Sequence, residues 1–265
     1  MVYGLLGMIN FAHGDLYMFG AFIALTLLLL GLPVPLVLLL ACLFGGLLGI
    51  IVERTCYRPV RNAPRIVPMI TALGAALILR SVAQLIWGAQ PKPFPLVLPT
   101  GFVSIGSIQI PIVPLIVFGV SLLLMLIFSF LVQKTKLGLA VRSVSQDIPV
   151  ARYMGIHVNG IIMLVYFMGS FLGVASGILF GAYYNTVSIN MGFVGTLKAW
   201  TAAIIGGIGH IQGAFIGGLL LGVFEALIAG FISSQYEDAI TFVLLILILI
   251  FKPTGLFGHQ ITKKG

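Results

Sequence analysis

The chain has 265 residues, of which 60% are hydrophobic and 8% are charged, and its mean hydropathy is +1.19. Because a soluble domain has about a quarter of its residues charged, this composition excludes a soluble globular protein. It predicts an all-α, polytopic membrane protein whose helices cross about 30 Å of hydrocarbon. The net charge of +8 would suggest a nucleic-acid partner for a soluble protein. In a membrane protein it indicates basic loops in the cytoplasm, so no nucleic acid is expected.

Apolar segments predict eight membrane-spanning helices along the chain. In chain order they are expected at residues 16–31, 32–52, 66–87, 112–133, 161–184, 193–208, 213–231 and 236–251. Of the connections, GLPVP (31–35) is a tight turn and GAQPKPFPLVLPTG (88–101) is a proline-rich loop that cannot be helical throughout. No separate soluble domain is visible, so residues 1–265 are expected to form a single domain.

The basic residues are concentrated on one side of the predicted membrane. Eleven of the fourteen lysines and arginines fall in residues 53–65, 134–160 and 252–265, whereas the connections on the other side contain only Lys92. Because basic loops stay in the cytoplasm, these three segments are expected there. The acidic stretch SSQYED (233–238) is then expected outside.

Polar residues interrupt the first apolar stretch, GMINFAHGD (7–15), which contains Asn10, His13 and Asp15. No histidine or cysteine lies at metal-ligand spacing from His13, so this segment is interpreted as a polar break, and no metal site is expected in the chain. A complete helix entering from the cytoplasm would put His13 outside, whereas the charge count puts it inside. A re-entrant or broken segment near residues 8–15 would reconcile the two, and Asn10 and His13 are candidates for lining the translocation path.

Glu225 is a charged residue inside the seventh predicted span, where a charge is costly. It shares one helix face with small residues, among them Gly218 and Gly222, which are predicted to let a neighbouring helix approach closely. Glu225 is therefore expected to face protein rather than lipid. It either forms a structural hydrogen bond or ion pair within the bundle, or it acts in gating and lines the path.

Arg80 and Lys198 are the two basic residues within the predicted spans. Arg80 either extends outward to the interface or pairs inside the bundle, and Lys198 is expected to anchor the outer end of its span. The stretch YYNTVSINMGFVGT (183–196) is rich in small polar residues. It is either a plain outer loop or unwound backbone open to a substrate, so Asn185 and Asn190 are further path candidates.

A patterned but polar segment, residues 134–160, lies in the cytoplasm. Its apolar residues recur at steps of three and four, which is typical of one face of an amphipathic helix, at Leu137, Val141, Val144, Ile148 and Ala151. Pro149 is expected to divide it into two short helices, and Gly155 is expected to end the second. The segment is either an interfacial helix lying on the membrane or a docking helix that transmits the motion of a partner.

Five motifs in one order carry a resemblance to a known family. MVYGLLGMINFAHGDLYMFGAF, ERTCYRPVR, DIPVARYMGI, KAWTAAIIGGIG and GAFIGGLLLGVFEAL follow one another as in the LivH-type permeases of branched-chain amino acid ABC importers. The resemblance extends over nearly the whole chain. It implies a permease that is not itself an enzyme and that imports leucine, isoleucine and valine by alternating access. Members of that family have a further helix before this point, so the chain is expected to lack their first helix.

The resemblance also implies partners in the bacterial cytoplasmic membrane. They are a LivM-type sister permease, two cytosolic ABC ATPases of the LivG and LivF type, and a periplasmic or lipid-anchored substrate-binding protein. The residues expected to dock on the ATPases are Asp147, Pro149, Ala151, Arg152, Met154, Gly155 and Ile156. The sequence has no G-x-x-x-x-G-K-[ST] phosphate loop, so ATP and Mg²⁺ are expected on the partner ATPases and no cofactor on this chain.

Two alternative functions stay open at this point. Transporters related to this family import urea, short amides or other amino acids. The resemblance therefore indicates the type of transporter more specifically than it indicates the substrate. A proton-coupled secondary transporter using His13, Asp15 and Glu225 as a relay would need no ATPase, but the docking segment argues against it. An enzyme is not indicated, because neither a G-x-S-x-G nor an H-E-x-x-H motif is present.

Overall fold

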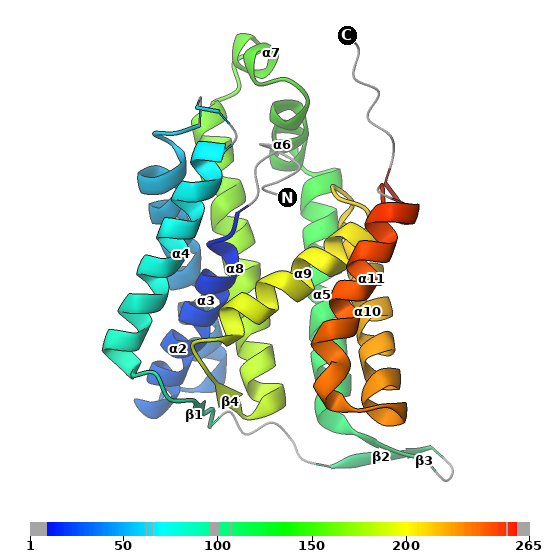
Figure 1. Cartoon of the computed structure of the whole chain (residues 1–265). Coiled ribbons are helices and arrows are strands. Elements are labelled where there is room, and N and C mark those ends of the chain that lie inside the picture. The colour runs from blue at the N-terminus through cyan, green and yellow to red at the C-terminus, as the bar shows by residue number, and fades with distance from the viewer. Residues whose placement is uncertain are drawn as a thin grey trace. The chain divides into compact units, whose positions relative to one another are not determined.

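The computed structural model describes residues 10–61, 63–64, 66–95, 101–105, 108–252 and 254–258, and most of them are helical (Figure 1). The contacts between residues divide the chain into two compact units. Among the described residues, the larger unit covers 10–193 and the smaller unit covers 194–258. The boundary falls inside one helix, α9 (Met191–Gly206).

The larger unit contains seven helices before the start of α9 among its described residues. They are α2 (His13–Leu29), α3 (Val34–Val52), α4 (Ile66–Trp87), α5 (Ile112–Lys134), α6 (Lys136–Gln146), α7 (Ile148–Tyr153) and α8 (Val158–Tyr184). At its end α3 widens into a π-helix, η1 (Glu53–Tyr57). The smaller unit contains the rest of α9, followed by α10 (Ile211–Phe231), the 3₁₀ turn η2 (Ser234–Tyr236) and α11 (Glu237–Phe251).

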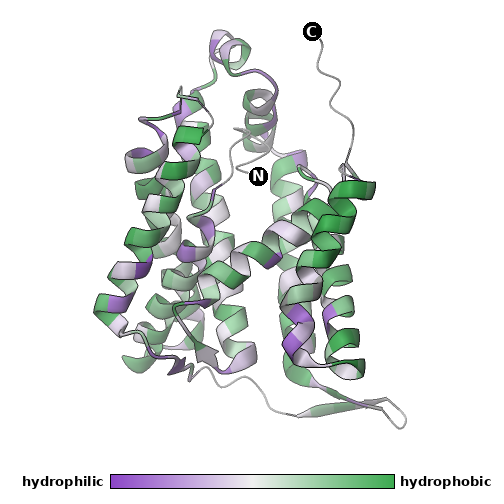
Figure 2. Cartoon of the chain, viewed as in Figure 1, coloured by the Kyte–Doolittle hydropathy of each residue, from purple (hydrophilic) through white to green (hydrophobic). Residues whose placement is uncertain are grey.

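Every apolar segment predicted from the sequence is a helix in the structure. Within the described part of the chain, five helices are long and apolar enough to cross a membrane, namely Val34–Tyr57, Ile66–Trp87, Ile112–Lys134, Val158–Tyr184 and Ile211–Phe231. Large apolar side chains such as Leu85 and Phe130 are exposed on these helices, and most residues along the helices are hydrophobic (Figure 2). This is the distribution of a protein that meets lipid. The polytopic helical class is confirmed, while the number of eight spans stays a prediction because α2, α9 and the apolar part of α11 are shorter.

Two short strand pairings were not predicted from the sequence. Strand β1 (Lys92–Pro93) pairs antiparallel with β4 (Thr186–Val187), and β2 (Phe102–Ile105) pairs with β3 (Ile108–Pro111). The first pairing joins segments far apart in the chain, and the Thr186 hydroxyl also donates to the Lys92 carbonyl at 3.2 Å. Local patterns do not reveal such a contact, so the connection after α4 was expected to be a plain loop.

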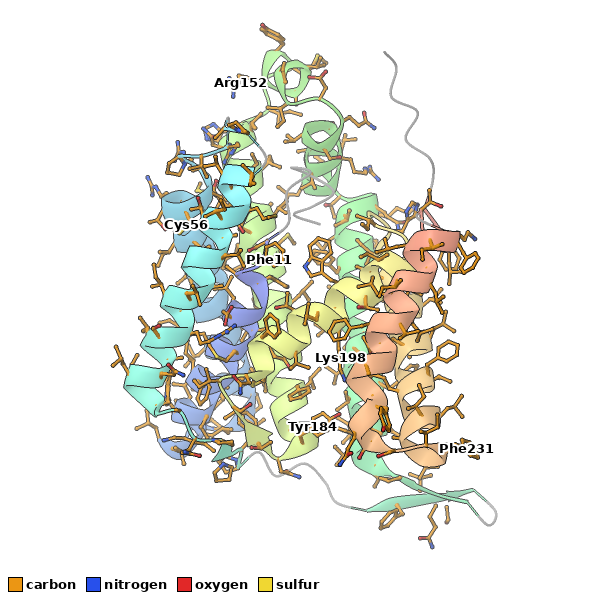
Figure 3. All side chains as sticks on the ribbon, viewed as in Figure 1. Phe11, Cys56, Arg152, Tyr184, Lys198 and Phe231 are labelled. Carbon is orange, nitrogen blue, oxygen red and sulfur yellow. The ribbon has the colours of Figure 1, made fainter. Side chains whose placement is uncertain are left out.

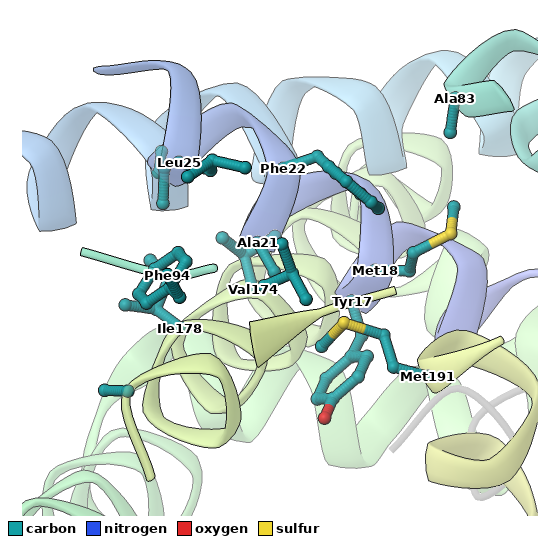
Figure 4. Close-up of a cluster of buried hydrophobic side chains, with 14 of the residues drawn as sticks. Tyr17, Met18, Ala21, Phe22, Leu25, Ala83, Phe94, Val174, Ile178 and Met191 are labelled. Atoms are coloured by element: carbon teal, nitrogen blue, oxygen red, sulfur yellow. The ribbon is translucent and has the colours of Figure 1, made fainter. Parts of the chain in front are cut away.

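The core of the larger unit is the seam where α2, α3 and α8 meet. Buried side chains of α2, such as Met18 and Phe22, belong to one hydrophobic cluster with Val174 of α8 (Figure 4). Gly20 of α2 and Gly45 of α3 both face Val174, and a Cβ at either glycine would overlap its methyl groups. The absence of side chains at these two positions lets three helix backbones approach closely, which positions the start of α2 against α8.

Candidate functional site

The polar start of α2 lies beside the middle of α8 rather than at its end (Figure 1). A Cβ built on Gly173, near the midpoint of the 27-residue helix α8, would lie 3.1 Å from Cε1 of His13. A Cβ on Gly192, at the start of α9, would lie 2.7 Å from the Gly14 carbonyl oxygen. Both α2 and α9 thus begin partway along a helix long enough to cross the membrane. This is the geometry that a broken segment requires.

The re-entrant segment predicted near residues 8–15 is described only from Asn10 onward, because residues 8 and 9 lie outside the described residues. Within the described part, α2 begins at His13, so Asp15 belongs to its first turn. His13 lies against Gly173 of α8. Its part in the translocation path stays a prediction.

Arg80 of α4 forms an ion pair with Asp15 in the interior of the larger unit. The Arg80 Nη2 and Nε atoms lie 3.1 Å and 3.2 Å from Oδ1 of Asp15. The guanidinium carbon also lies 5.9 Å from the centre of the Phe193 ring. Of the two sequence interpretations of Arg80, pairing inside the bundle is therefore confirmed, and extension to the interface is wrong. The pair links α4 to the beginnings of α2 and α9.

Asn10 is buried and faces η1. The Tyr57 hydroxyl donates to Oδ1 of Asn10 at 2.8 Å, and the Tyr57 ring lies 5.2 Å from the Tyr166 ring of α8, centre to centre. Burial of an amide requires such a partner. A role for Asn10 in lining the path stays a prediction.

A second polar cluster at η1 was missed in the sequence analysis. Glu53, which is fully buried, forms an ion pair with Arg61, and Nη1 of Arg61 donates to Oδ1 of Asn159 at 3.0 Å. The sequence signal was an acidic residue directly after an apolar span, within the motif ERTCYRPVR. Neither its arginine partner nor the π-helix was indicated by local spacing.

The segment predicted to dock a partner forms two short helices, α6 and α7. The division falls at Asp147, whose side chain accepts a hydrogen bond from the Val150 N–H at 2.9 Å and so begins α7. Pro149 lies in the first turn of α7, as expected. Gly155, with φ +81°, ends it, while the Ile156 N–H donates to the Ala151 carbonyl at 3.0 Å. This is a Schellman-type end, in which glycine takes the left-handed conformation.

The predicted docking residues do not all face outward. Arg152 lies at the tip of the larger unit (Figure 3), and Met154 is also exposed, together with Tyr153 at 89%. Ala151 is buried and holds α7 against its own unit. A hollow of about 480 Å³ lies between α6 and α7 and is lined by Lys136, Leu139, Ala140, Ser143, Gln146, Asp147, Val150, Ala151, Met154 and Ile156. This surface therefore presents both a recess and projecting side chains.

In the smaller unit, Glu225 of α10 pairs with its neighbours. Its Oε1 lies 3.0 Å from Nζ of Lys198 in α9 and accepts a hydrogen bond from the Thr241 hydroxyl of α11 at 2.7 Å. The structural interpretation of Glu225 matches this geometry, and its gating role stays a prediction. Lys198 forms this ion pair with a side chain that is 29% exposed, and its expected role as an anchor at the outer end of its span stays a prediction.

Close packing in the smaller unit involves glycines adjacent to the predicted ones. A Cβ on Gly217 would overlap the Ala202 carbonyl of α9, whereas one on Gly218 would only touch the Ala202 Cβ at 3.8 Å. Within the described residues, nothing lies within 4 Å of a Cβ built on Gly222. The helix face towards α9 is therefore rotated by about one residue from the predicted one, and the packing role of Gly218 and Gly222 stays a prediction.

Asn185 and Asn190 lie in the connection between α8 and α9, and both are exposed. Asn185 adopts the left-handed conformation, with φ +52°, and its carbonyl accepts a hydrogen bond from the Phe94 N–H at 3.0 Å. Asparagine tolerates this conformation better than most residues, so Asn185 has a clear role in turning the chain. Contact of either residue with a substrate stays a prediction.

Comparison with known proteins points to one family. A family profile described as branched-chain amino acid transport system / permease component matches residues 1–249. The chain is 40% identical over 277 residues to the high-affinity branched-chain amino acid transport system permease protein BraD of Pseudomonas aeruginosa, with 100% of this chain and 90% of BraD covered.

Two further relatives extend the similarity. LivH of Salmonella typhimurium, also named a high-affinity branched-chain amino acid transport system permease protein, is 35% identical over 100% of this chain and 90% of its own length. The probable branched-chain amino acid transport permease protein LivH of Methanocaldococcus jannaschii is 30% identical over 94% of this chain and 82% of its own length. No solved structure matches the chain significantly.

Proposed function

Because the chain belongs to the family of branched-chain amino acid transport permease components, we propose that it is the membrane-spanning subunit of an ATP-driven importer of leucine, isoleucine and valine. The observation that carries the proposal is the similarity of the whole chain to permeases named for this transport. The exposed apolar helices agree with a subunit embedded in lipid, and we place it in the bacterial cytoplasmic membrane.

The importer proposed here needs further subunits. We assign it a LivM-type sister permease, two cytosolic ATPases of the LivG and LivF type, and a periplasmic or lipid-anchored binding protein. ATP and Mg²⁺ bind to the ATPases, so hydrolysis occurs there and this chain holds no cofactor. The surface proposed for the ATPases is α6 and α7, where Arg152 and Met154 project beside the hollow.

The geometry of the larger unit supports a mechanism of alternating access. Helix α7 leads directly into α8 through Gly155, and α8 runs beside the start of α2 at Gly173. A shift of α7 under an ATPase would therefore move α8, and with it the polar break where His13 and Asp15 lie. We propose that this break opens and closes the translocation path. The candidate residues for lining or gating that path remain Asn10, His13, Asn185, Asn190 and Glu225.

The alternatives are less well supported. The names of the relatives favour branched-chain amino acids over urea or short amides. A proton relay needs carboxylates that change their protonation state, but Asp15 and Glu225 are each paired with a basic residue. The family description, a transport system permease component, also favours the importer over a proton-coupled carrier.

Uptake by the complete transporter tests the proposal. The permease would be purified with its sister subunit and ATPases, reconstituted into liposomes containing ATP, and supplied with the binding protein and labelled leucine outside. We expect uptake that requires ATP and that excess isoleucine or valine reduces, whereas excess urea or acetamide does not. Uptake that persists without ATP and collapses with the proton gradient would overturn the proposal. Competition by urea alone would overturn the assigned substrate.

A further inference from the structure

The polar cluster at η1 connects elements that the proposed mechanism must move together. Glu53 and Tyr57 both belong to η1, and π-helical turns are often found at functional sites. Glu53 forms an ion pair with Arg61, and Arg61 donates a hydrogen bond to Asn159 in the first turn of α8. The Tyr57 hydroxyl donates a hydrogen bond to Asn10, which lies shortly before the start of α2. One short segment therefore touches both the helix that follows the docking segment and the start of the polar break.

The hydrogen bonding of this cluster is incomplete in the described structure. Oε2 of Glu53, Nε of Arg61 and the hydroxyl of Tyr166 are buried and have no partner among the described residues. A buried polar atom without a partner is costly, and one in a native structure needs an explanation. A cluster that served only to hold the fold together would be expected to satisfy these atoms.

Two of the unpaired atoms belong to neighbouring elements, Glu53 to η1 at the end of α3 and Tyr166 to α8. Gly49 is one helical turn before Glu53, and a Cβ built on it would lie 2.9 Å from the Tyr166 carbonyl. Glu53 thus follows Gly49 along the face that meets Tyr166. The Tyr166 hydroxyl and Oε2 of Glu53 are both unpaired, so a hydrogen bond between them would satisfy both atoms. A second arrangement of the cluster that forms this hydrogen bond would provide the two states that a transmitting element requires.

We propose that Glu53, Arg61 and Asn159 are positioning residues that transmit the movement of α7 and α8 to the start of α2, with Tyr166 completing the cluster in the second arrangement. This inference rests on the proposed function, because it assigns a transport step to the cluster. The inference gives α7 two separate roles. Its exposed tip contacts the ATPase, and its movement passes through the first turn of α8 to the cluster.

The ratio of leucine imported to ATP hydrolysed, measured per assembled complex in liposomes, tests the transmission. Arg61→Gln removes the charge that joins Glu53 to α8, whereas Arg58→Gln removes the same charge from an exposed position of the same loop and is the matched control. We expect the ratio to fall about tenfold in R61Q, within the range of known coupling free energies, and to stay at the wild-type value in R58Q. An unchanged ratio in assembled R61Q would overturn the inference.

Tyr166→Phe separates transmission from structural support, and it keeps the inference testable if R61Q fails to assemble. Removal of an unpaired buried hydroxyl should leave the complex as stable as the wild type or more so. Our inference nevertheless predicts a severalfold lower ratio of import to hydrolysis in Y166F, because the second arrangement loses its hydrogen bond. A stable Y166F complex with the wild-type ratio would overturn it. A wild-type complex that imports no branched-chain amino acid would instead overturn the proposed function itself.

Discussion

Among the described residues, an ion pair joins two helices in each unit, Asp15–Arg80 in the larger and Glu225–Lys198 in the smaller, and the two pairs differ in how deeply they are buried. In the larger unit, the Asp15 side chain is 3% exposed and that of Arg80 is 26% exposed. In the smaller unit, Glu225 and Lys198 are 20% and 29% exposed. Glu225 also has a neutral donor, Thr241, whereas Asp15 relies on Arg80 for every side-chain hydrogen bond among those described.

This difference indicates which pair holds its unit together more firmly. A buried charge that loses its partner is left without compensation, whereas a partly exposed charge can still reach polar surroundings. The Asp15–Arg80 pair also connects three helices. Asp15 belongs to α2 and Arg80 to α4, and the Arg80 guanidinium lies over the Phe193 ring of α9. We therefore expect the first pair to be the more sensitive to substitution, and the experiments below test that order.

The largest effect is expected for Arg80→Leu. It leaves the buried Asp15 carboxylate without its partner, which typically costs about 3–5 kcal/mol. We expect a lower yield of assembled complex and a strongly reduced free energy of unfolding, measured by denaturant titration in detergent. Gln84→Leu is the matched control, because Gln84 lies one turn further along α4 and is exposed.

A double variant shows whether the charge is responsible. In Asp15→Asn combined with Arg80→Gln, two neutral amides replace the ion pair and keep a hydrogen bond within reach. We expect this variant to recover most of the stability that R80L loses. If the double variant were as unstable as R80L, the shape of Arg80 rather than the charge of Asp15 would be the cause.

A smaller effect is expected for Glu225→Gln. The amide oxygen still accepts from Thr241, and Lys198 retains partial exposure, so the loss of stability should be about 1 kcal/mol. Unfolding titrations of the assembled complex would measure it. The same variant tests gating: if E225Q assembles normally but no longer transports leucine, Glu225 acts in the path. Normal transport would leave only the structural role.

Much of the fold followed from the sequence because hydropathy depends on local composition. The span at 66–87 and the two-part segment at 134–160 were predicted because each is defined by its own residues. The partner of Arg80 was not, because Asp15 lies 65 residues away and only the packing of α2 brings it near. Glu53 was missed for the same reason, since its role depends on Arg61 and on Asn159 of α8.

The smallest effect is expected for Phe193→Leu, which distinguishes the contact of Arg80 with the Phe193 ring from its ion pair with Asp15. Phe193→Leu keeps an apolar side chain at the start of α9 but removes the aromatic face beneath the guanidinium, which lies 5.9 Å from the ring centre. Such a contact contributes about 0.5–1 kcal/mol at partly exposed sites, so unfolding titrations should show a loss well below that of R80L. In R80L, where the cation is already absent, adding F193L should cost almost nothing further. An equal loss in both backgrounds would show that Phe193 stabilises the break through packing alone, and that the ion pair with Asp15 accounts for the whole contribution of the Arg80 charge.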